Sequence, residues 1–274
     1  MSVDHHSAGP GGVSFDFTGR VAVVTGATGG IGTAITEAFT AAGADLVLHG
    51  RNTEVLEERA AQVRARGRRA VVATGNIRDP ETSAGIVAAA EAEFGRVDVL
   101  INNAGGNFGV RLADMSVGAW NATVEANLSG AFHLTRAALP LLRAAGGGSV
   151  VNIGSVSANY AHPLRGAYAA AKAGLASLTR TLSWELAEDG IRVNCVEPGA
   201  VLTRASRFTE ADTERAVSRH IALGRVGAGD DIASVCLFLA SNGAAYITGE
   251  TIRVAGGPHP STPADVDLIR AGLS

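Results

Sequence analysis

The stretch RVAVVTGATGGIG, residues 20–32, decides the fold of this 274-residue chain. Its first half is a continuous apolar run, which is typical of a strand covered on both faces of a parallel sheet. Its second half, TGATGGIG (25–32), has glycines at positions 26, 30 and 32, where a helix is predicted to begin. Glycine allows a tight turn and a close backbone approach to phosphate, and a helix N-terminus supplies N–H donors. The stretch therefore predicts a strand, a phosphate-binding turn and a helix in succession.

Six more apolar runs follow, and longer helical patterns separate them. Because strands and helices alternate, the crossovers are expected to be right-handed and the strands parallel. The expected fold class is α/β: a single-domain, doubly wound (Rossmann) parallel sheet of about seven strands flanked by helices, with ligands bound at the carboxyl ends of the strands. The predicted strands are residues 20–26, 44–50, 69–75, 97–103, 149–155, 191–197 and 250–256, and the helical patterns cover residues 29–43, 79–95, 117–145 and 166–189.

The composition is that of an ordinary globular protein, with 46% hydrophobic and 18% charged residues. The formal net charge is −3 and no long basic run occurs, which argues against nucleic acid or an anionic membrane as a partner.

Cys195 and Cys236 are too few and too far apart for a disulfide framework or a zinc site, and no metal is expected. No segment has the pattern of a signal peptide or a membrane span, so the expected location is cytoplasmic.

Lys172 is the only lysine in the chain, because the other basic residues are all arginine. It follows Tyr168 by four residues, so both side chains project from one face of a helix predicted to start near Arg165. A cation about 4 Å from the tyrosine hydroxyl, at an effective dielectric of about 20, would stabilise the phenolate by about 4 kcal/mol. This attraction would lower the tyrosine pKa by up to about 3 units. Desolvation of the phenolate opposes the change, so the value is an upper bound. An ammonium is also compact and can relay protons, unlike a guanidinium. The pair therefore indicates a functional site rather than a chance lysine on a solvated helix face.

Four motifs occur in a fixed order along the chain: TGATGGIG (25–32), NNAG (102–105), YAAAK (168–172) and NCVEPGAVLT (194–203). Together they resemble the motifs of the short-chain dehydrogenase/reductase (SDR) family. The resemblance covers roughly residues 18–257 and implies one SDR domain, with a flexible leader at residues 1–17 and a C-terminal tail at residues 258–274. It also implies an oxidoreductase that uses a nicotinamide dinucleotide.

The resemblance implies a catalytic set of Asn127, Ser155, Tyr168 and Lys172. Ser155 stands thirteen residues before Tyr168 and matches the serine whose hydroxyl donates to the substrate oxygen; Ser157 is the nearby alternative. Asn127 matches the asparagine that holds a water in the proton relay of the family, and the alternative is an ordinary buried amide. Tyr168 would serve as the general acid/base.

The cofactor would contact residues that follow the strands of both halves of the sheet. The position after the second strand decides between the two dinucleotides, since an acid there binds the ribose 2′-OH of NAD and an arginine accommodates the 2′-phosphate of NADP. Gly50 takes the place of the acid and Arg51 follows it, which favours NADP(H) and leaves NAD(H) possible if Arg51 is only a solvated loop residue. The predicted cofactor residues are Gly26, Thr28, Gly30, Ile31, Gly32, Arg51, Asn76, Ile77, Asn103, Ala104, Gly105, Tyr168, Lys172, Pro198, Gly199, Val201 and Thr203.

Two positions depart from the pattern of NADP(H)-dependent relatives. Gly29 stands where many of them carry a second basic residue, and Asn76 replaces an aspartate that often contacts the adenine. The amide oxygen of Asn76 can still accept a hydrogen bond from the adenine amino group.

The substrate pocket is expected between residues 106–110, residues 158–164 including Tyr160, and a lid at about 203–224. The function expected first is NADPH-dependent reduction of a ketone or a 3-oxoacyl thioester to the secondary alcohol. The pair Glu188-Asp189 weakens the 3-oxoacyl carrier-protein assignment, because reductases of that kind usually show a basic residue there. The alternatives are an NAD-dependent alcohol dehydrogenase acting on a sugar or steroid-like substrate, and a dinucleotide-sensing protein without turnover.

The remaining partner expected from the resemblance is a second copy of the chain. Members of the family are commonly homotetramers joined through two long helices and the last strand. The apolar faces of residues 131–145 and 173–187 are compatible with that assembly, although burial within the monomer would produce the same pattern.

Overall fold

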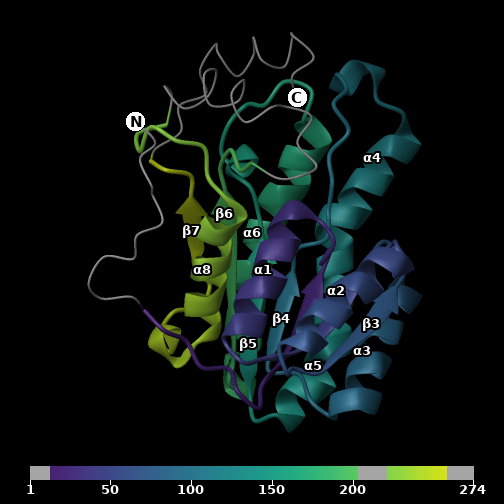
Figure 1. The fold of residues 1–274 in the computed structure, drawn as a ribbon. Helices are drawn as coiled ribbons and strands as arrows, with labels where there is room; N and C mark the ends of the chain where they lie inside the picture. The colour runs from purple at the N-terminus through teal and green to yellow at the C-terminus, as the bar shows by residue number, and fades with distance from the viewer. Residues whose placement is uncertain (1–12, 203–220, 258–274) are drawn as a thin grey trace.

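The computed structural model describes residues 13–202 and 221–257 (Figure 1). The predicted tail, Thr203 and most of the predicted leader and lid therefore lie outside the described residues. Phe17, which the sequence pattern assigns to the leader, is instead buried, and its ring centroid lies 5.1 Å from that of Phe39. The packed core thus includes this aromatic pair ahead of the first strand.

Seven parallel strands form one sheet in the order β3-β2-β1-β4-β5-β6-β7. Each strand begins and ends within two residues of its predicted bounds, so the predicted fold class and strand set are confirmed. The strands are β1 (Val21–Thr25), β2 (Asp45–Gly50), β3 (Ala70–Thr74), β4 (Val99–Asn102), β5 (Gly148–Ile153), β6 (Ile191–Pro198) and β7 (Thr251–Val254).

Helices cover both faces of this sheet (Figure 1). On one face Phe39, Leu56 and Ile232 belong to one buried apolar cluster with alternate strand residues. On the other face Ile86 and Leu134 belong to a second cluster. Full burial of each such side chain contributes about 1.5–3 kcal/mol. The first face carries α1 (Gly30–Ala41), α2 (Thr53–Ala65) and α8 (Gly229–Ala240), and the second carries α3 (Pro80–Phe94), α5 (Gly130–Ala144) and α6 (Gly166–Glu185).

The long helix predicted over residues 117–145 is interrupted. It consists of α4 (Val117–Val124), a π-helical turn η2 (Glu125–Ser129) and α5. Helical periodicity alone does not reveal a π turn, because the apolar pattern continues through it. Such turns occur frequently at functional sites, and this one carries Asn127.

The helix predicted over residues 166–189 also ends early. α6 stops at Glu185, and a 3₁₀ turn, η4 (Ala187–Asp189), leads to Gly190 at φ +69°. Glycine adopts this left-handed conformation without the steric penalty of a side chain, so the chain can turn there into β6.

The sheet has its switch point between β1 and β4, because the connections leave these neighbours toward opposite edges. Thr25 joins the two strand ends there. Its Oγ1 donates to the Ile101 carbonyl (3.1 Å) and accepts from the backbone N–H groups of Asn103 and Ala104 (2.9 Å each). The Asn103 amide donates back to the Thr25 carbonyl (2.8 Å). One buried hydroxyl therefore fixes where the loop after β4 lies relative to the end of β1.

Thr25→Val tests this junction, because valine keeps the shape and removes the hydroxyl. Two backbone N–H groups lose their acceptor, and we expect a loss of about 2–4 kcal/mol in the free energy of unfolding, measured by urea denaturation. Thr74→Val, at the exposed end of β3, removes only an exposed hydrogen bond with the Thr53 hydroxyl (3.0 Å); it is the control and should change stability by less than about 0.5 kcal/mol. Equal, small effects of both substitutions would contradict the role of Thr25.

Candidate active site

The turn between β1 and α1 is shaped by two glycines. Gly26 has φ +64°, and a Cβ there would come within 2.9 Å of Asn103 Nδ2. A Cβ on Gly32 would collide with the carbonyl oxygen of Gly26. α1 begins after Gly29, and no side chain caps its N-terminus. Backbone N–H groups at this helix start therefore lack a side-chain acceptor, an arrangement that suits a phosphate.

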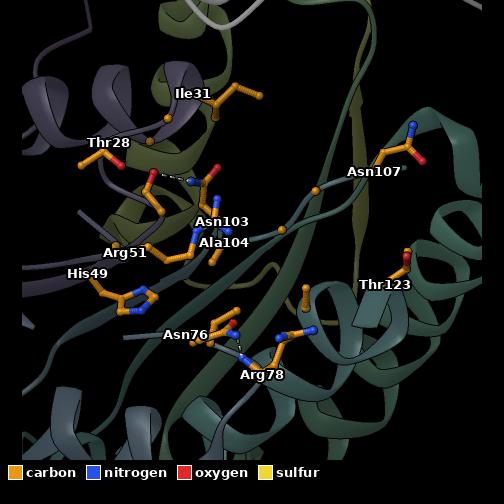
Figure 2. A pocket seen from close by; sticks show the side chains of 18 of the residues that line it. Thr28, Ile31, His49, Arg51, Asn76, Arg78, Asn103, Ala104, Asn107 and Thr123 are labelled. Carbon is orange, nitrogen blue, oxygen red and sulfur yellow. Dashed lines mark hydrogen bonds between the residues drawn. The ribbon is translucent and has the colours of Figure 1, made fainter. Parts of the chain in front are cut away.

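A cavity of about 700 Å³ opens beside this turn, at the carboxyl ends of β1, β2 and β4 (Figure 2). Most of the predicted cofactor residues line it, whereas Tyr168, Lys172, Pro198, Gly199 and Val201 do not. The predicted residues that the structure brings together here are Gly26, Thr28, Gly30, Ile31, Gly32, Arg51, Asn76, Ile77, Asn103, Ala104 and Gly105.

Sequence reasoning missed several residues of this cavity. Its wall also includes His49, Arg78, Ala122, Thr123 and Ala126. No motif marks these residues, but their place in the fold predicts that they border the cavity. His49 lies near the end of β2, Arg78 follows β3, and Ala122, Thr123 and Ala126 belong to the helical segment after β4. Burial lowers the pKa of His49, and the ring Nε2 lies 3.2 Å from the Gly75 carbonyl oxygen. A neutral imidazole therefore borders the cavity.

Two arginines border the same cavity, and Figure 2 shows them flanking Asn76. Arg51 is exposed, and Arg78 is half-buried with its backbone N–H donating to Asn76 Oδ1 at 3.3 Å. Within the described ranges of the chain, neither guanidinium is paired with a carboxylate. Positive charge is therefore available to an anion in this cavity.

Asn127 holds the loop that follows β4. Its Nδ2 donates to the carbonyl oxygens of Gly106 (2.7 Å) and Thr123 (2.9 Å), and its Oδ1 accepts from the Gly106 N–H (3.2 Å). A Cβ on Gly105 would collide with Oδ1 and lie 3.6 Å from Lys172 Nζ. Asn127 is thus a buried amide with both donors engaged inside the chain, and its oxygen retains acceptor capacity toward a water.

Ser155, Tyr168 and Lys172 come together behind Gly105. Ser155 follows β5 and is 9% exposed, and its Oγ accepts from the Ser157 N–H at 3.2 Å. Lys172 is buried on α6; its Nζ donates to the Ile153 carbonyl at 2.7 Å and lies 5.6 Å from the centroid of the Tyr168 ring. The alternative serine, Ser157, is buried more deeply, at 1% exposure.

Burial governs the titration of this group. It raises the pKa of Tyr168, while a hydrogen bond with Ser155 and the positive charge of Arg165 lower it. Burial also lowers the pKa of Lys172 to about 8. The net lowering of the tyrosine pKa expected from Lys172 is therefore not found, because removing the phenol from water outweighs the hydrogen bond with Ser155 and the charge of Arg165. Lys172 is still mostly an ammonium at neutral pH.

Arg165 is the N-cap residue that directly precedes α6, three residues before Tyr168, and its charge acts on the Tyr168 hydroxyl. The Nε of Arg165 is buried and lacks a hydrogen-bond partner among residues 13–202 and 221–257. The preceding residue, Leu164, has φ +68°, a conformation in which a leucine is strained. The strained step leads directly into the helix that carries Tyr168.

The second half of the predicted cofactor set lies at the ends of β6 and β7. The Gly199 N–H donates to the Val254 carbonyl at 3.0 Å, and a Cβ on Gly199 would approach that of Ala255 to 2.7 Å. Val201 pairs with Gly227 in a short bridge. The structure places Pro198 beside Gly199 at the end of β6, and Thr203 lies outside the described residues.

Two walls of the predicted substrate pocket are described. Residues 106–110 and 158–164 are linked by a hydrogen bond from the Val110 N–H to the Leu164 carbonyl at 3.1 Å. Phe108, on the first wall, is 58% exposed. The third wall, the predicted lid, falls mainly on residues that the structure does not describe.

Cys195 and Cys236 are free thiols in the core, and burial raises the pKa of each to about 12. In the described part of the chain, no cluster of three or more His, Cys, Asp or Glu side chains is arranged to hold a metal ion. A helix of membrane-spanning length and hydrophobicity is likewise absent from that part.

Known proteins resemble the chain over most of its length. A family model described as enoyl-(acyl carrier protein) reductase matches residues 26–259. The 3-oxoacyl-[acyl-carrier-protein] reductase of Escherichia coli is 37% identical over 88% of this chain and 98% of its own length. The corresponding reductase of Thermotoga maritima is 36% identical over 87% of this chain and 97% of its own.

A solved structure shares the fold as well as the sequence. It is described as a short-chain alcohol dehydrogenase of Sinorhizobium meliloti, with a TM-score of 0.84 and 38% identity, over 89% of this chain and 98% of that one. The family model spans the quoted motifs except Thr25, the first residue of the glycine motif. The chain therefore belongs to the short-chain dehydrogenase/reductase family of oxidoreductases, enzymes that act on carbonyl and alcohol groups.

Proposed function

We propose that this chain reduces a ketone or a 3-oxoacyl thioester to the secondary alcohol with NADPH. The observation that carries the proposal is the convergence of Ser155, Tyr168 and Lys172 behind Gly105, a residue that also lines the cavity beside the glycine turn. A proton donor and a dinucleotide-sized cavity thus share one wall.

The residues of that cavity fit a dinucleotide phosphate. The glycine turn has no Cβ in the way, the start of α1 is uncapped by side chains, and Arg51 is exposed and not paired with a described carboxylate. A guanidinium binds a phosphate in a bidentate manner, which favours NADP(H) over NAD(H). The Asn76 side chain offers an amide to the adenine in place of a carboxylate.

A bound nicotinamide would supply the hydride to the carbonyl carbon. Tyr168 then donates its proton to the carbonyl oxygen, so that the product is a neutral alcohol. Ser155 donates a hydrogen bond to the same oxygen as negative charge develops on it. A tyrosine whose pKa is raised by burial is protonated at neutral pH and is therefore ready as an acid. The Lys172 ammonium stabilises the phenolate left behind.

The curated relatives support the 3-oxoacyl thioester as the substrate class. The pair Glu188-Asp189 does not oppose this substrate class. Asp189 accepts from Arg143 at 2.7 Å and directly precedes β6, so it lies at the amino end of the strands, opposite the cavity. The description of the matching family model suggests enoyl reduction, but the Tyr168–Lys172 pair suits protonation of an oxygen. The relative described as an alcohol dehydrogenase favours oxidation as the second candidate.

We also propose a homotetramer, with α5 and α6 in its interfaces. Phe132 on α5 is 40% exposed and Trp184 on α6 is 87% exposed. Aromatic side chains are enriched at interfaces between subunits. The cytoplasmic location stays a prediction.

Arg51→Ala tests the cofactor. We expect NADPH binding, followed by nicotinamide fluorescence, to weaken about 10–100-fold, because a charge-assisted contact worth about 1.5–3 kcal/mol is lost. NADH binding should stay unchanged, and Arg66→Ala, an exposed arginine at the end of α2, should change neither. A preference of the native protein for NADH would replace the reductase proposal with the dehydrogenase.

Tyr168→Phe tests the acid. Removal of the hydroxyl should lower kcat for acetoacetyl-CoA about 10²–10⁴-fold and weaken NADPH binding far less, because proton donation is the main loss and Tyr168 is only one of many predicted cofactor contacts. Tyr246→Phe, at a fully exposed tyrosine, is the matched control. Full activity of the Tyr168 variant would exclude this mechanism.

Arg165→Gln tests the electrostatics of Tyr168 in the free protein. The positive charge of Arg165 lowers the pKa of Tyr168, so its removal should move formation of the phenolate to higher pH. The transition is followed by ultraviolet absorbance, with the Tyr168→Phe variant as the baseline. Arg180→Gln, at an exposed arginine of α6, should leave the transition in place. An unchanged transition in the Arg165 variant would refute the coupling.

A further inference from the structure

A buried carboxylate that the proposed reaction does not use lies near the end of β6. Glu197 is 2% exposed and directly precedes Pro198-Gly199, two of the predicted cofactor residues. Burial raises its pKa, while Asn159 and Arg253 lower it. Taking a carboxylate out of water carries a free-energy cost, so its presence at this position calls for a physical reason.

Glu197 connects the end of the sheet to the segment that follows Ser155. Asn159 Nδ2 donates to Glu197 Oε2 at 2.7 Å. Glu197 is also paired in register with Arg253 of β7, whose Nε lies 4.0 Å from the same oxygen. The carboxylate thus faces one amide donor from the loop and one guanidinium from the neighbouring strand.

Arg253 extends the connection to the next residue of the loop. Its Nη1 donates to the Tyr160 hydroxyl at 2.7 Å, and its guanidinium carbon lies 5.4 Å from the centroid of the Tyr160 ring. Tyr160 was expected to line the substrate pocket, and its hydroxyl is here bonded to β7. Two successive loop residues, Asn159 and Tyr160, are therefore fastened to two adjacent strands. We call Glu197, Asn159, Arg253 and Tyr160 the loop anchor.

The loop anchor lies directly behind the candidate catalytic serine. The Gly154 N–H donates to the Val196 carbonyl at 2.7 Å, and a Cβ on Gly154 would come within 3.1 Å of Glu197 Cγ. Ser155 follows this close contact, and the loop then returns as the pocket wall that ends at Leu164. The position of Ser155 and the shape of that wall consequently depend on where Glu197 holds the chain.

We propose that Glu197 is a positioning residue, which fixes residues 156–164 through Asn159 and, with Arg253, through Tyr160, and so sets the substrate-binding wall beside Ser155. This inference rests on the proposed function for its kinetic consequence. An apolar side chain of similar size fills buried space at least as well as a carboxylate, but it offers no acceptor that selects one conformation of the loop. The role therefore concerns the geometry of the substrate wall more than the stability of the domain.

The kinetic test compares Glu197→Ala with Glu197→Gln, which keeps an acceptor for Asn159. We expect the Ala variant to raise KM for acetoacetyl-CoA about tenfold, the effect of one lost hydrogen bond, while the Kd for NADPH stays unchanged. The Gln variant should restore most of the KM. Asp189→Asn, which removes the 2.7 Å ion pair with Arg143 at the other end of the sheet, is the control and should leave KM unchanged. A native KM in the Ala variant, or an equal loss in the Gln variant, would overturn the proposal.

A second readout needs no substrate. Amide hydrogen exchange of residues 156–164 should become faster in Glu197→Ala and in Arg253→Met, and should stay native in Asp189→Asn. If the native protein reduces no ketone but this exchange pattern appears, the proposed function fails and the positioning role stands. If the loop exchanges at the native rate in both variants, the positioning role fails, whatever the enzyme reduces. Arg253→Met decides the matter should Glu197→Ala not fold.

Discussion

The hydroxyl of Thr25 is the interaction on which the candidate active site depends. A doubly wound sheet leaves a crevice between β1 and β4 for topological reasons. The topology does not fix the position of the loop after β4 relative to the end of β1. That loop carries Asn103 and Gly105, and it is fixed because one buried hydroxyl accepts two of its backbone N–H groups. Gly105 in turn packs against Asn127 and Lys172. The glycine turn and the candidate catalytic group therefore share a single support.

Desolvation has opposite effects on the two ionisable groups of that site. Tyr168 is kept protonated and Lys172 is brought within reach of deprotonation at mildly alkaline pH. The helical spacing of the pair indicated a lowered tyrosine pKa, but the desolvation that opposes the Coulomb attraction is the larger effect. Arg165, the residue before α6, adds a second positive charge near Tyr168. In a reductase, the raised pKa would keep Tyr168 protonated until negative charge develops on the substrate oxygen. After the proton transfer, the positive charges of Lys172 and Arg165 would stabilise the Tyr168 phenolate.

The fold could be predicted from the sequence because each strand is a short, apolar, β-branched run, and burial on both faces of a parallel sheet produces that pattern directly. The glycine turn and the Tyr168–Lys172 pair could be found for the same reason: each is contiguous or lies within one helical turn. Features that depend on contacts between distant segments could not be found. The π turn at Asn127 leaves helical periodicity unbroken, and Thr123 reaches the cavity only because α4 follows β4. Glu197 reads as one polar residue in an apolar strand until β7 and the loop after β5 are placed beside it.

Several buried polar groups lie at the carboxyl end of the sheet, where ligands bind in this fold, whereas others, such as Asp98 and Ser149, lie at its amino end. Glu197, Lys172, Asn127 and Ser155 are all buried at or beyond the carboxyl ends of the strands, whereas the two clusters that stabilise the helix layers are apolar. Each of these groups carries a desolvation penalty that an apolar residue would avoid. A chain under selection for stability alone would replace them, so their persistence indicates that geometry matters more than stability at these positions. Leu164, the last residue of the pocket wall, has φ +68°. This local strain is tolerated for the same reason, because it positions the helix that carries Tyr168.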